Sequence, residues 1–128
     1  NFVFYDLMQL ALGVCGREQL ALSVAAPVVA THPGRRETVI YAGAVHLSKE
    51  QGLCPEGKIH YGQAVFYGPD GKIEWPEHSA YIRRISQEHG IVSWPDGIPE
   101  AVKPGSLLGI VPVHACLSVN LIREYFVV

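Results

Sequence analysis

Short runs of β-branched and aromatic residues, separated by turn residues, recur along the whole of this 128-residue chain. Few of these runs continue at helical spacing beyond two turns. The pattern predicts an all-β fold, either an antiparallel β-sandwich or a partly closed barrel of about seven or eight short strands with at most a short helix. Strands are expected within the ranges 19–31, 37–42, 58–67, 79–86, 91–94, 107–113 and 121–128.

Several segments carry more specific predictions. The range 19–31 is rich in Val and Ala, which predicts a strand covered on both faces and bent or bulged at Pro27, where a ladder donor is missing. The range 44–55 alternates poorly and is expected to be a loop. Residues 1–5 suggest a strand end, and the apolar spacing within 6–13 predicts one or two helical turns.

Glycine and proline mark three turns between the expected strands. Pro69 presets φ and Gly71 can take a positive φ, so the Gly-Pro-Asp-Gly run predicts a hairpin turn. Gly90 suits the left-handed position of a second, short hairpin loop. Pro104 and Gly105 have the order required at the centre of a type II turn.

Composition and charge narrow the classes of function. With 48% apolar and 17% charged residues, the chain suits one compact domain rather than a disordered segment. The net charge is −2, and the arginine pairs at 35–36 and 83–84 form no basic stripe, so no nucleic acid is expected as a partner. The apolar run 20–30 is too short to span a bilayer, so no membrane partner is expected. No Gly-rich strand-to-helix loop for nucleotide phosphates is present.

The cysteines and the start of the chain bear on its origin. Cys15, Cys54 and Cys116 form an odd and widely spaced set, unlike the paired framework of a small secreted domain. We therefore expect a cytoplasmic protein. The chain opens inside an apolar run without an initiator Met or a signal sequence, which predicts that residues 1–128 are one domain cut from a longer protein.

The clearest candidate for chemistry is the pair His114 and Cys116. If this segment is extended, side chains two positions apart project from the same face and reach a single divalent ion. Zinc accepts both imidazole and thiolate ligands. Two ligands do not complete a tetrahedral site, so the others would come from elsewhere in the fold, from water or from substrate, as in catalytic sites. The alternative is that both residues are plain core.

Three further residues are candidates for catalysis. Glu88 and His89 fall in the second hairpin loop, where the carboxylate can orient the imidazole, or where both simply face water. Tyr5 and Asp6 end the first apolar run and can present a phenol and a carboxylate to a cleft. Asp6 is equally well explained as an ordinary helix N-cap.

Four segments resemble, in order, one family of enzymes. They are residues 1–6 with Gln9, the run 41–49, the run 86–90, and Pro112-Val113-His114-Ala115-Cys116, which is followed by Asn120. Together they are similar to the D-serine dehydratase and D-threonine aldolase family, pyridoxal-phosphate enzymes of fold type III with the alanine-racemase fold. The resemblance spans nearly the whole chain, and it implies the smaller, C-terminal β domain of such an enzyme.

The resemblance implies how the chemistry is divided. The cofactor lysine and phosphate site belong to a preceding (β/α)₈ barrel that this chain lacks, so the chain alone is expected to be inactive. His114 and Cys116 are implied to hold a divalent ion, zinc, which binds the β-hydroxyl of a small D-amino-acid substrate as a Lewis acid. Pyridoxal phosphate is the implied electron sink. The implied partners are the N-terminal barrel domain and a second copy in a homodimer.

Three positions bear on the branch of the family. Cysteine rather than aspartate at position 116 resembles the dehydratase branch, and the soft thiolate agrees with zinc. Tyr41 replaces a common acidic residue, and Val45 replaces a frequent lysine. Those departures leave an aldolase or a racemase-like branch open. The contrasting alternative is a non-catalytic β-sandwich module for dimerisation or packing, with His114 and Cys116 merely buried.

Overall fold

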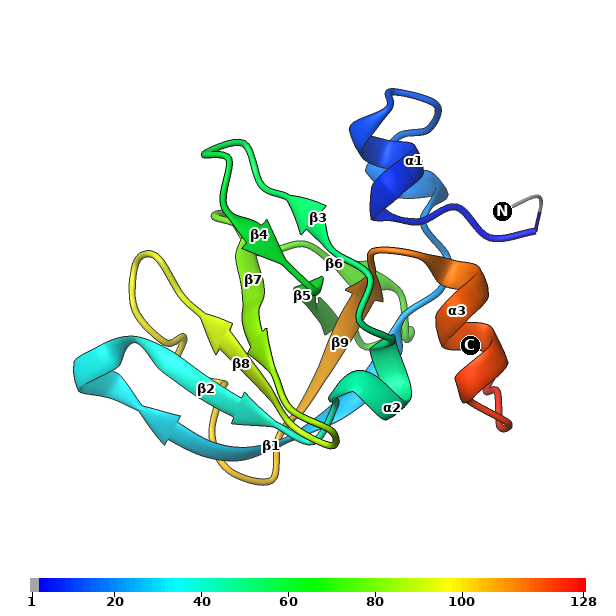
Figure 1. Ribbon diagram of the computed structural model, residues 1–128. Coiled ribbons are helices and arrows are strands. Elements are labelled where there is room, and N and C mark those ends of the chain that lie inside the picture. The colour runs from blue at the N-terminus through cyan, green and yellow to red at the C-terminus, as the bar shows by residue number, and fades with distance from the viewer. Residues whose placement is uncertain (1–2) are drawn as a thin grey trace.

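The computed structural model describes residues 3–128, in which nine strands alternate with short helices (Figure 1). The strands are β1 (Val24–His32), β2 (Glu37–Ile40), β3 (Gly52–Leu53), β4 (Ile59–His60), β5 (Gly62–Tyr67), β6 (Ile73–Glu74), β7 (Ala80–Ile85), β8 (Gly90–Ser93) and β9 (Leu107–Pro112). The helices are α1 (Leu7–Ala11), α2 (Ala44–Leu47) and α3 (Ala115–Leu121), with 3₁₀ turns η1 (Arg17–Gln19) and η2 (Pro33–Arg35). In this part of the chain no helix is long and apolar enough to cross a bilayer.

Antiparallel pairing closes six of the strands into a barrel. The order is β5-β7-β8-β2-β1-β9, and β9 returns to pair with β5, while β6 extends the sheet from β5. Strands β3 and β4 form a separate two-stranded ribbon. The predicted fold class is therefore confirmed in its barrel form, and closure removes the open sheet edges that a sandwich leaves exposed.

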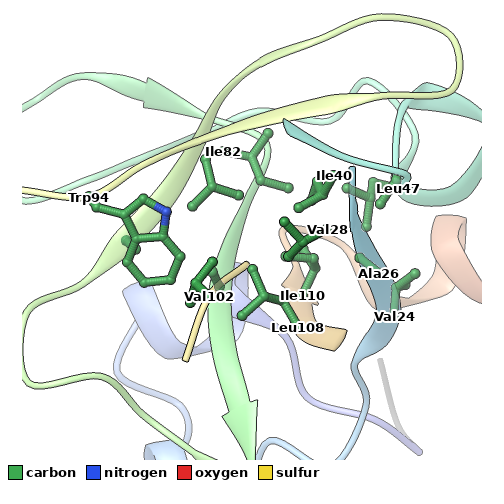
Figure 2. Packing of buried hydrophobic residues seen from close by; sticks show 14 residues of the cluster. Val24, Ala26, Val28, Ile40, Leu47, Ile82, Trp94, Val102, Leu108 and Ile110 are labelled. Carbon is green, nitrogen blue, oxygen red and sulfur yellow. The ribbon is translucent and has the colours of Figure 1, made fainter. Parts of the chain in front are cut away.

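The barrel interior is filled by aliphatic side chains with Trp94 at one end (Figure 2). Along β1 the residues alternate, with Val24, Ala26 and Val28 buried and the residues between them exposed. The prediction that this strand is covered on both faces is wrong, because the outer face of the barrel wall meets solvent here. The irregularity expected at Pro27 lies further along the strand, since Pro27 pairs in register with Leu107 and the β1–β2 register shifts between Val28 and Ala30.

Two of the three predicted turns have the expected geometry. Gly71 has φ +78° and its N–H donates to Gly68 O at 2.9 Å, and Gly105 has φ +89° in the turn closed by Ser106 N–H on Lys103 O. Gly90, however, does not take the predicted left-handed conformation. This glycine begins β8, and a Cβ there would lie 2.7 Å from the carbonyl oxygen of Ala42, so close backbone approach explains it.

Three further expectations are corrected. The segment 44–55 contains helix α2 and strand β3 rather than only a loop. The last expected strand, 121–128, does not form, because α3 ends at Leu121 and the closed β5–β9 pairing offers no sheet edge for another strand. Residues 3–5 form no strand either, while residues 1 and 2 of that expected strand end lie outside the described residues.

The N-terminal segment covers part of the outer wall of the barrel. Helix α1 confirms the predicted helical turns, and its Leu7 is buried with Leu20 against Val65 of β5 and Val111 of β9. Strand β9 is consequently apolar on both faces, since Ile110 points inward and Val111 meets this outer cluster. Figure 1 shows α1 and α3 on the same side of the barrel, beyond the end of β9.

Candidate functional site

His114 and Cys116 lie where β9 passes into α3. The strand ends at Pro112, His114 is the N-cap of α3 with φ −130° and ψ 110°, and Cys116 is the second residue of the helix. The expectation that both project from one extended strand is therefore wrong, because the chain turns into a helix between them. The imidazole is half-buried, whereas Cys116 is exposed.

A buried carboxylate from the start of the chain holds this junction. Asp6 is fully buried, and its Oδ1 accepts from Gln9 N–H at 3.0 Å, so it is the predicted N-cap of α1. Its Oδ2 accepts from Ala115 N–H at 2.8 Å and lies 3.2 Å from Nδ1 of His114. Met8 N–H also donates to Val113 O at 3.2 Å. Asp6 therefore joins α1 to the start of α3.

The contact with Asp6 determines which ring nitrogen of His114 is available. The two oxygens of the Asp6 carboxylate accept from the backbone N–H groups of Gln9 and Ala115. An ionised carboxylate can only accept hydrogen bonds, so in its contact with His114 the proton is on Nδ1. In a neutral ring the other nitrogen, Nε2, then has a lone pair. An imidazole held in this way is arranged as metal-ligating histidines usually are, with one nitrogen on a carboxylate and the other on the ion.

A hollow of about 750 Å³ lies beside Cys116 on α3. The residues that line it include Cys116 and Asn120 of α3, Arg123 just beyond that helix, and Val3 and Phe4 from the N-terminal segment. Among residues 3–128 no three His, Cys, Asp or Glu side chains gather as a metal site, so the pair would need further ligands.

The other predicted catalytic residues lie in two places. Tyr5 is half-buried and packs on the outer cluster with Leu7 and Val111. Glu88 and His89 lie in the turn between β7 and β8, as expected, with Glu88 exposed and His89 half-buried.

The β7–β8 turn is part of an aromatic group that the sequence did not reveal. The ring of Tyr41 meets His89 edge-on at 5.5 Å and His46 at 5.2 Å between centroids. Burial lowers the pKa of His46, which Glu88 partly counteracts and His89 reinforces. His46 lies on α2, a helix too short to leave a periodic signal in the sequence.

Helix α2 connects this aromatic group to the junction at α3. The N–H groups of Ala44 and Val45 donate to Ser86 O at 2.9 Å and to Gln87 O at 3.1 Å, which fastens α2 to the β7–β8 turn. On its other side α2 packs against α3. The turn that carries His89 and the helix that carries Cys116 are therefore both in contact with α2.

Residues 21–128 match the family model described as "Putative serine dehydratase domain". The chain belongs to this family. Asp6 and the rest of the N-terminal segment lie before the matched residues, so its link to α3 is not part of what that family model describes.

Relatives within the family have two different lengths. D-serine dehydratase of Saccharomyces cerevisiae is 30% identical over all of this chain, which spans only 29% of that enzyme. D-threo-3-hydroxyaspartate dehydratase of Delftia sp. is 31% identical over 91% of this chain, which spans 31% of it. An uncharacterised protein of Mycobacterium tuberculosis H37Rv is 32% identical over 96% of this chain, and here the chain spans 84% of the relative. This chain thus covers about a third of the two dehydratases.

Solved structures agree with the fold. The Delftia dehydratase superposes with a TM-score of 0.74 at 31% identity, over 94% of this chain and 32% of that one. An alanine-racemase-like protein of Idiomarina loihiensis gives a TM-score of 0.77 at 27% identity, over 94% of this chain and 31% of that one. Two solved variants of a D-threo-3-hydroxyaspartate dehydratase also match, one with a histidine and one with a cysteine replaced by alanine. The replaced positions are two residues apart, and the cysteine variant is in a metal-free form.

Proposed function

We propose that this chain is the metal-binding β domain of a pyridoxal-phosphate-dependent dehydratase that removes water from a β-hydroxy D-amino acid, with His114 and Cys116 as the metal ligands. The observation that carries the proposal is the arrangement at the β9–α3 junction. An imidazole with Nδ1 on a buried carboxylate lies two residues before an exposed thiol. The same His-x-Cys spacing separates the two positions substituted in the variants of D-threo-3-hydroxyaspartate dehydratase.

The donor set suits a zinc ion. Imidazole nitrogen and thiolate sulfur are both zinc ligands, and a thiolate favours zinc over harder divalent ions. The hollow beside Cys116 leaves room for a further ligand from water or substrate, as a catalytic site requires. His114 would bind the ion through Nε2 and Cys116 through Sγ.

Pyridoxal phosphate would be held mainly outside this chain. The exposed lysines are Lys49, Lys58, Lys72 and Lys103, and none of them lines the hollow beside Cys116. The proposed partners are a preceding barrel domain, which would carry the cofactor lysine, and a second copy in a homodimer, both on the resemblance to the family. We keep the cytoplasm as the proposed location, since Cys15, Cys54 and Cys116 form no disulfide.

The proposed chemistry assigns simple tasks to this chain. When bound, a divalent ion supplies Lewis acidity at the β-hydroxyl and pyridoxal phosphate supplies an electron sink at Cα. His114 and Cys116 would position the ion, and the apolar residues around the hollow would exclude water. Glu88 and His89 would face the substrate from the β7–β8 turn, and Tyr5 is a candidate with the same role.

The dehydratase is favoured over the aldolase and racemase-like alternatives by two observations. The named relatives are dehydratases of D-serine and of D-threo-3-hydroxyaspartate. Position 116 carries a thiol rather than a carboxylate. A non-catalytic packing module would need neither an exposed thiol nor an oriented imidazole at this junction.

The experiment measures bound metal and product together. The protein that contains this domain is purified as wild type, His114→Ala and Cys116→Ala, with Cys54→Ala, beside β3, and His32→Ala, at the end of β1, as matched controls away from the junction. Metal content is read by elemental analysis, and pyruvate and ammonium formation from D-serine are followed, with D-threo-3-hydroxyaspartate as a second substrate.

The expected result is loss of zinc and of turnover in both junction variants, with the two controls unchanged. Retention of metal and turnover in His114→Ala and Cys116→Ala would exclude the ligand assignment. Cleavage of D-threonine to glycine and acetaldehyde would favour the aldolase instead. Deuterium exchange at Cα without loss of the hydroxyl would favour the racemase-like branch.

A further inference from the structure

We infer that Asp6 is the positioning residue for His114, and that its carboxylate orients the imidazole so that Nε2 is the nitrogen presented to the metal. This inference deepens the proposed function and rests on its metal pair. Asp6 precedes α1 near the start of the chain, whereas His114 follows β9, so only the folded protein brings them together.

The geometry of the contact is specific to the carboxylate. Oδ2 of Asp6 lies 3.2 Å from Nδ1 of His114 and at the same time accepts from Ala115 N–H at 2.8 Å. A single oxygen therefore binds the side chain of His114 and the backbone of the next residue. Rotation of the imidazole about its own bonds would break the first contact while the second keeps the carboxylate in place.

The carboxylate is itself held firmly. Its second oxygen, Oδ1, accepts from Gln9 N–H at 3.0 Å, and the residue is fully buried beneath α1. Met8 N–H donates to Val113 O, which ties the same turn to the residue before His114. A buried acceptor with both oxygens bonded has little freedom to move, and this is the condition for it to orient another side chain.

Loss of Asp6 is expected to lower the affinity for the metal without changing which residues coordinate it. A carboxylate that accepts from the distal N–H of a metal-bound imidazole fixes the tautomer and raises the basicity of the coordinating nitrogen. Loss of such a partner typically lowers metal affinity by about 10- to 100-fold. Asp6 is not counted among the ligands, because its buried carboxylate is already bonded to Gln9 N–H, to Ala115 N–H and to Nδ1 of His114, and it acts through His114.

A competing role for Asp6 is that of a helix cap alone. The two roles separate in one substitution, because a serine at position 6 can still accept from Gln9 N–H as an N-cap but is shorter than aspartate and does not reach Nδ1 of His114. Asp6→Ser therefore keeps the cap of α1 and removes both contacts of Oδ2, with the imidazole and with Ala115 N–H, and only the first of these bears on the tautomer of His114.

The experiment uses this chain in the wild type, Asp6→Ser and His114→Ala forms. The tautomer of His114 is read from long-range ¹H–¹⁵N correlations on the metal-free protein at pH 8. The affinity for Co²⁺, as a spectroscopic probe for zinc, is then measured by titration of its visible absorption. Amide exchange of Leu10 reports on α1 in each variant.

We expect the wild type to hold His114 as the Nδ1–H tautomer, and Asp6→Ser to shift the ring towards the Nε2–H form that imidazole prefers in water. The Co²⁺ affinity of Asp6→Ser should fall by about 10- to 100-fold with α1 intact. An unchanged tautomer and unchanged affinity in Asp6→Ser would overturn the inference. If neither this chain nor the longer protein that contains it binds Co²⁺, the metal pair of the proposed function fails, and the tautomer result alone decides the role of Asp6.

Discussion

The carboxylate of Asp6 accepts a hydrogen bond of 2.8 Å from the backbone N–H of Ala115, although 109 positions of the chain separate the two residues. This bond places an N-terminal turn on the first residue of α3, beyond the end of the barrel wall. The two ends of the domain are therefore one structural unit, and the candidate metal pair lies at their junction.

Replacement of Asp6 by alanine should destabilise the whole domain. The substitution removes the N-cap of α1 and leaves Ala115 N–H and Nδ1 of His114 without their partner. Lost caps cost about 1 kcal/mol, and hydrogen bonds to charged groups about 1.5–3 kcal/mol, so we expect a loss of roughly 2–4 kcal/mol in the free energy of unfolding. Urea denaturation measures it. Asp70→Ala is the control, since Asp70 is exposed and its carboxylate contacts the neighbouring, exposed Lys72 in the same turn, and it should cost less than about 1 kcal/mol.

The buried hydrogen bond between Thr38 and Trp94 should matter more than the threonine methyl group. Nε1–H of Trp94 donates to Oγ1 of Thr38 at 2.9 Å inside the barrel. Thr38→Val keeps the shape but leaves the indole N–H unsatisfied, which should cost about 1–3 kcal/mol in guanidinium unfolding. Thr38→Ser retains the hydroxyl and should retain most of that energy. Equal losses in the two variants would contradict the hydrogen-bond account.

His60 should make the domain less stable in mild acid. Burial, reinforced by the nearby Arg83 charge, lowers the pKa of His60 to about 4, against an ordinary value near 6.5. Between those values the unfolded chain binds a proton that the folded chain does not. The free energy of unfolding should therefore fall as pH is lowered from about 6.5 to 4, by at most about 1.4 kcal/mol per pH unit from this residue.

The measurement is a series of urea titrations across that pH range. His60→Phe keeps a ring against Tyr81, whose centroid lies 4.6 Å from that of His60, and removes the titrating group. The variant should have a flatter profile than the wild type between pH 6.5 and 4. Parallel profiles for the two proteins would show that His60 is not the cause.

Gly43 should tolerate no side chain. A Cβ at this position would lie 2.6 Å from backbone atoms of the β7–β8 turn, at Gln87, Glu88 and His89. Gly43→Ala should push α2 away from that turn at a cost of about 1–3 kcal/mol, and should disturb the ring signals of His89 in NMR spectra. Gly34→Ala, where nothing lies within 4 Å of the added Cβ, is the control and should be nearly neutral.

Local chemistry allowed the strands and turns to be predicted. The β-branched run before Gly43 forms β2, and the Pro-Gly pair at 104–105 forms its turn with Gly105 at φ +89°. These features depend on residues close in sequence, so their signals survive without a tertiary context. The short helix α3 could not be predicted in this way, because its seven residues carry too little periodicity to compete with an apolar strand pattern.

The same distinction between local and tertiary information applies to the candidate site. By itself the sequence determined an all-β class, a His-x-Cys pair and a family resemblance, because each of these is written in neighbouring residues. Only the tertiary structure decided that β9 closes the barrel on β5, that Tyr41 lies between His46 and His89, and that Asp6 binds the start of α3. Such contacts form between backbone groups and side chains that are far apart in the chain. Their partners are chosen by the closure of the barrel, which no local pattern of residues records.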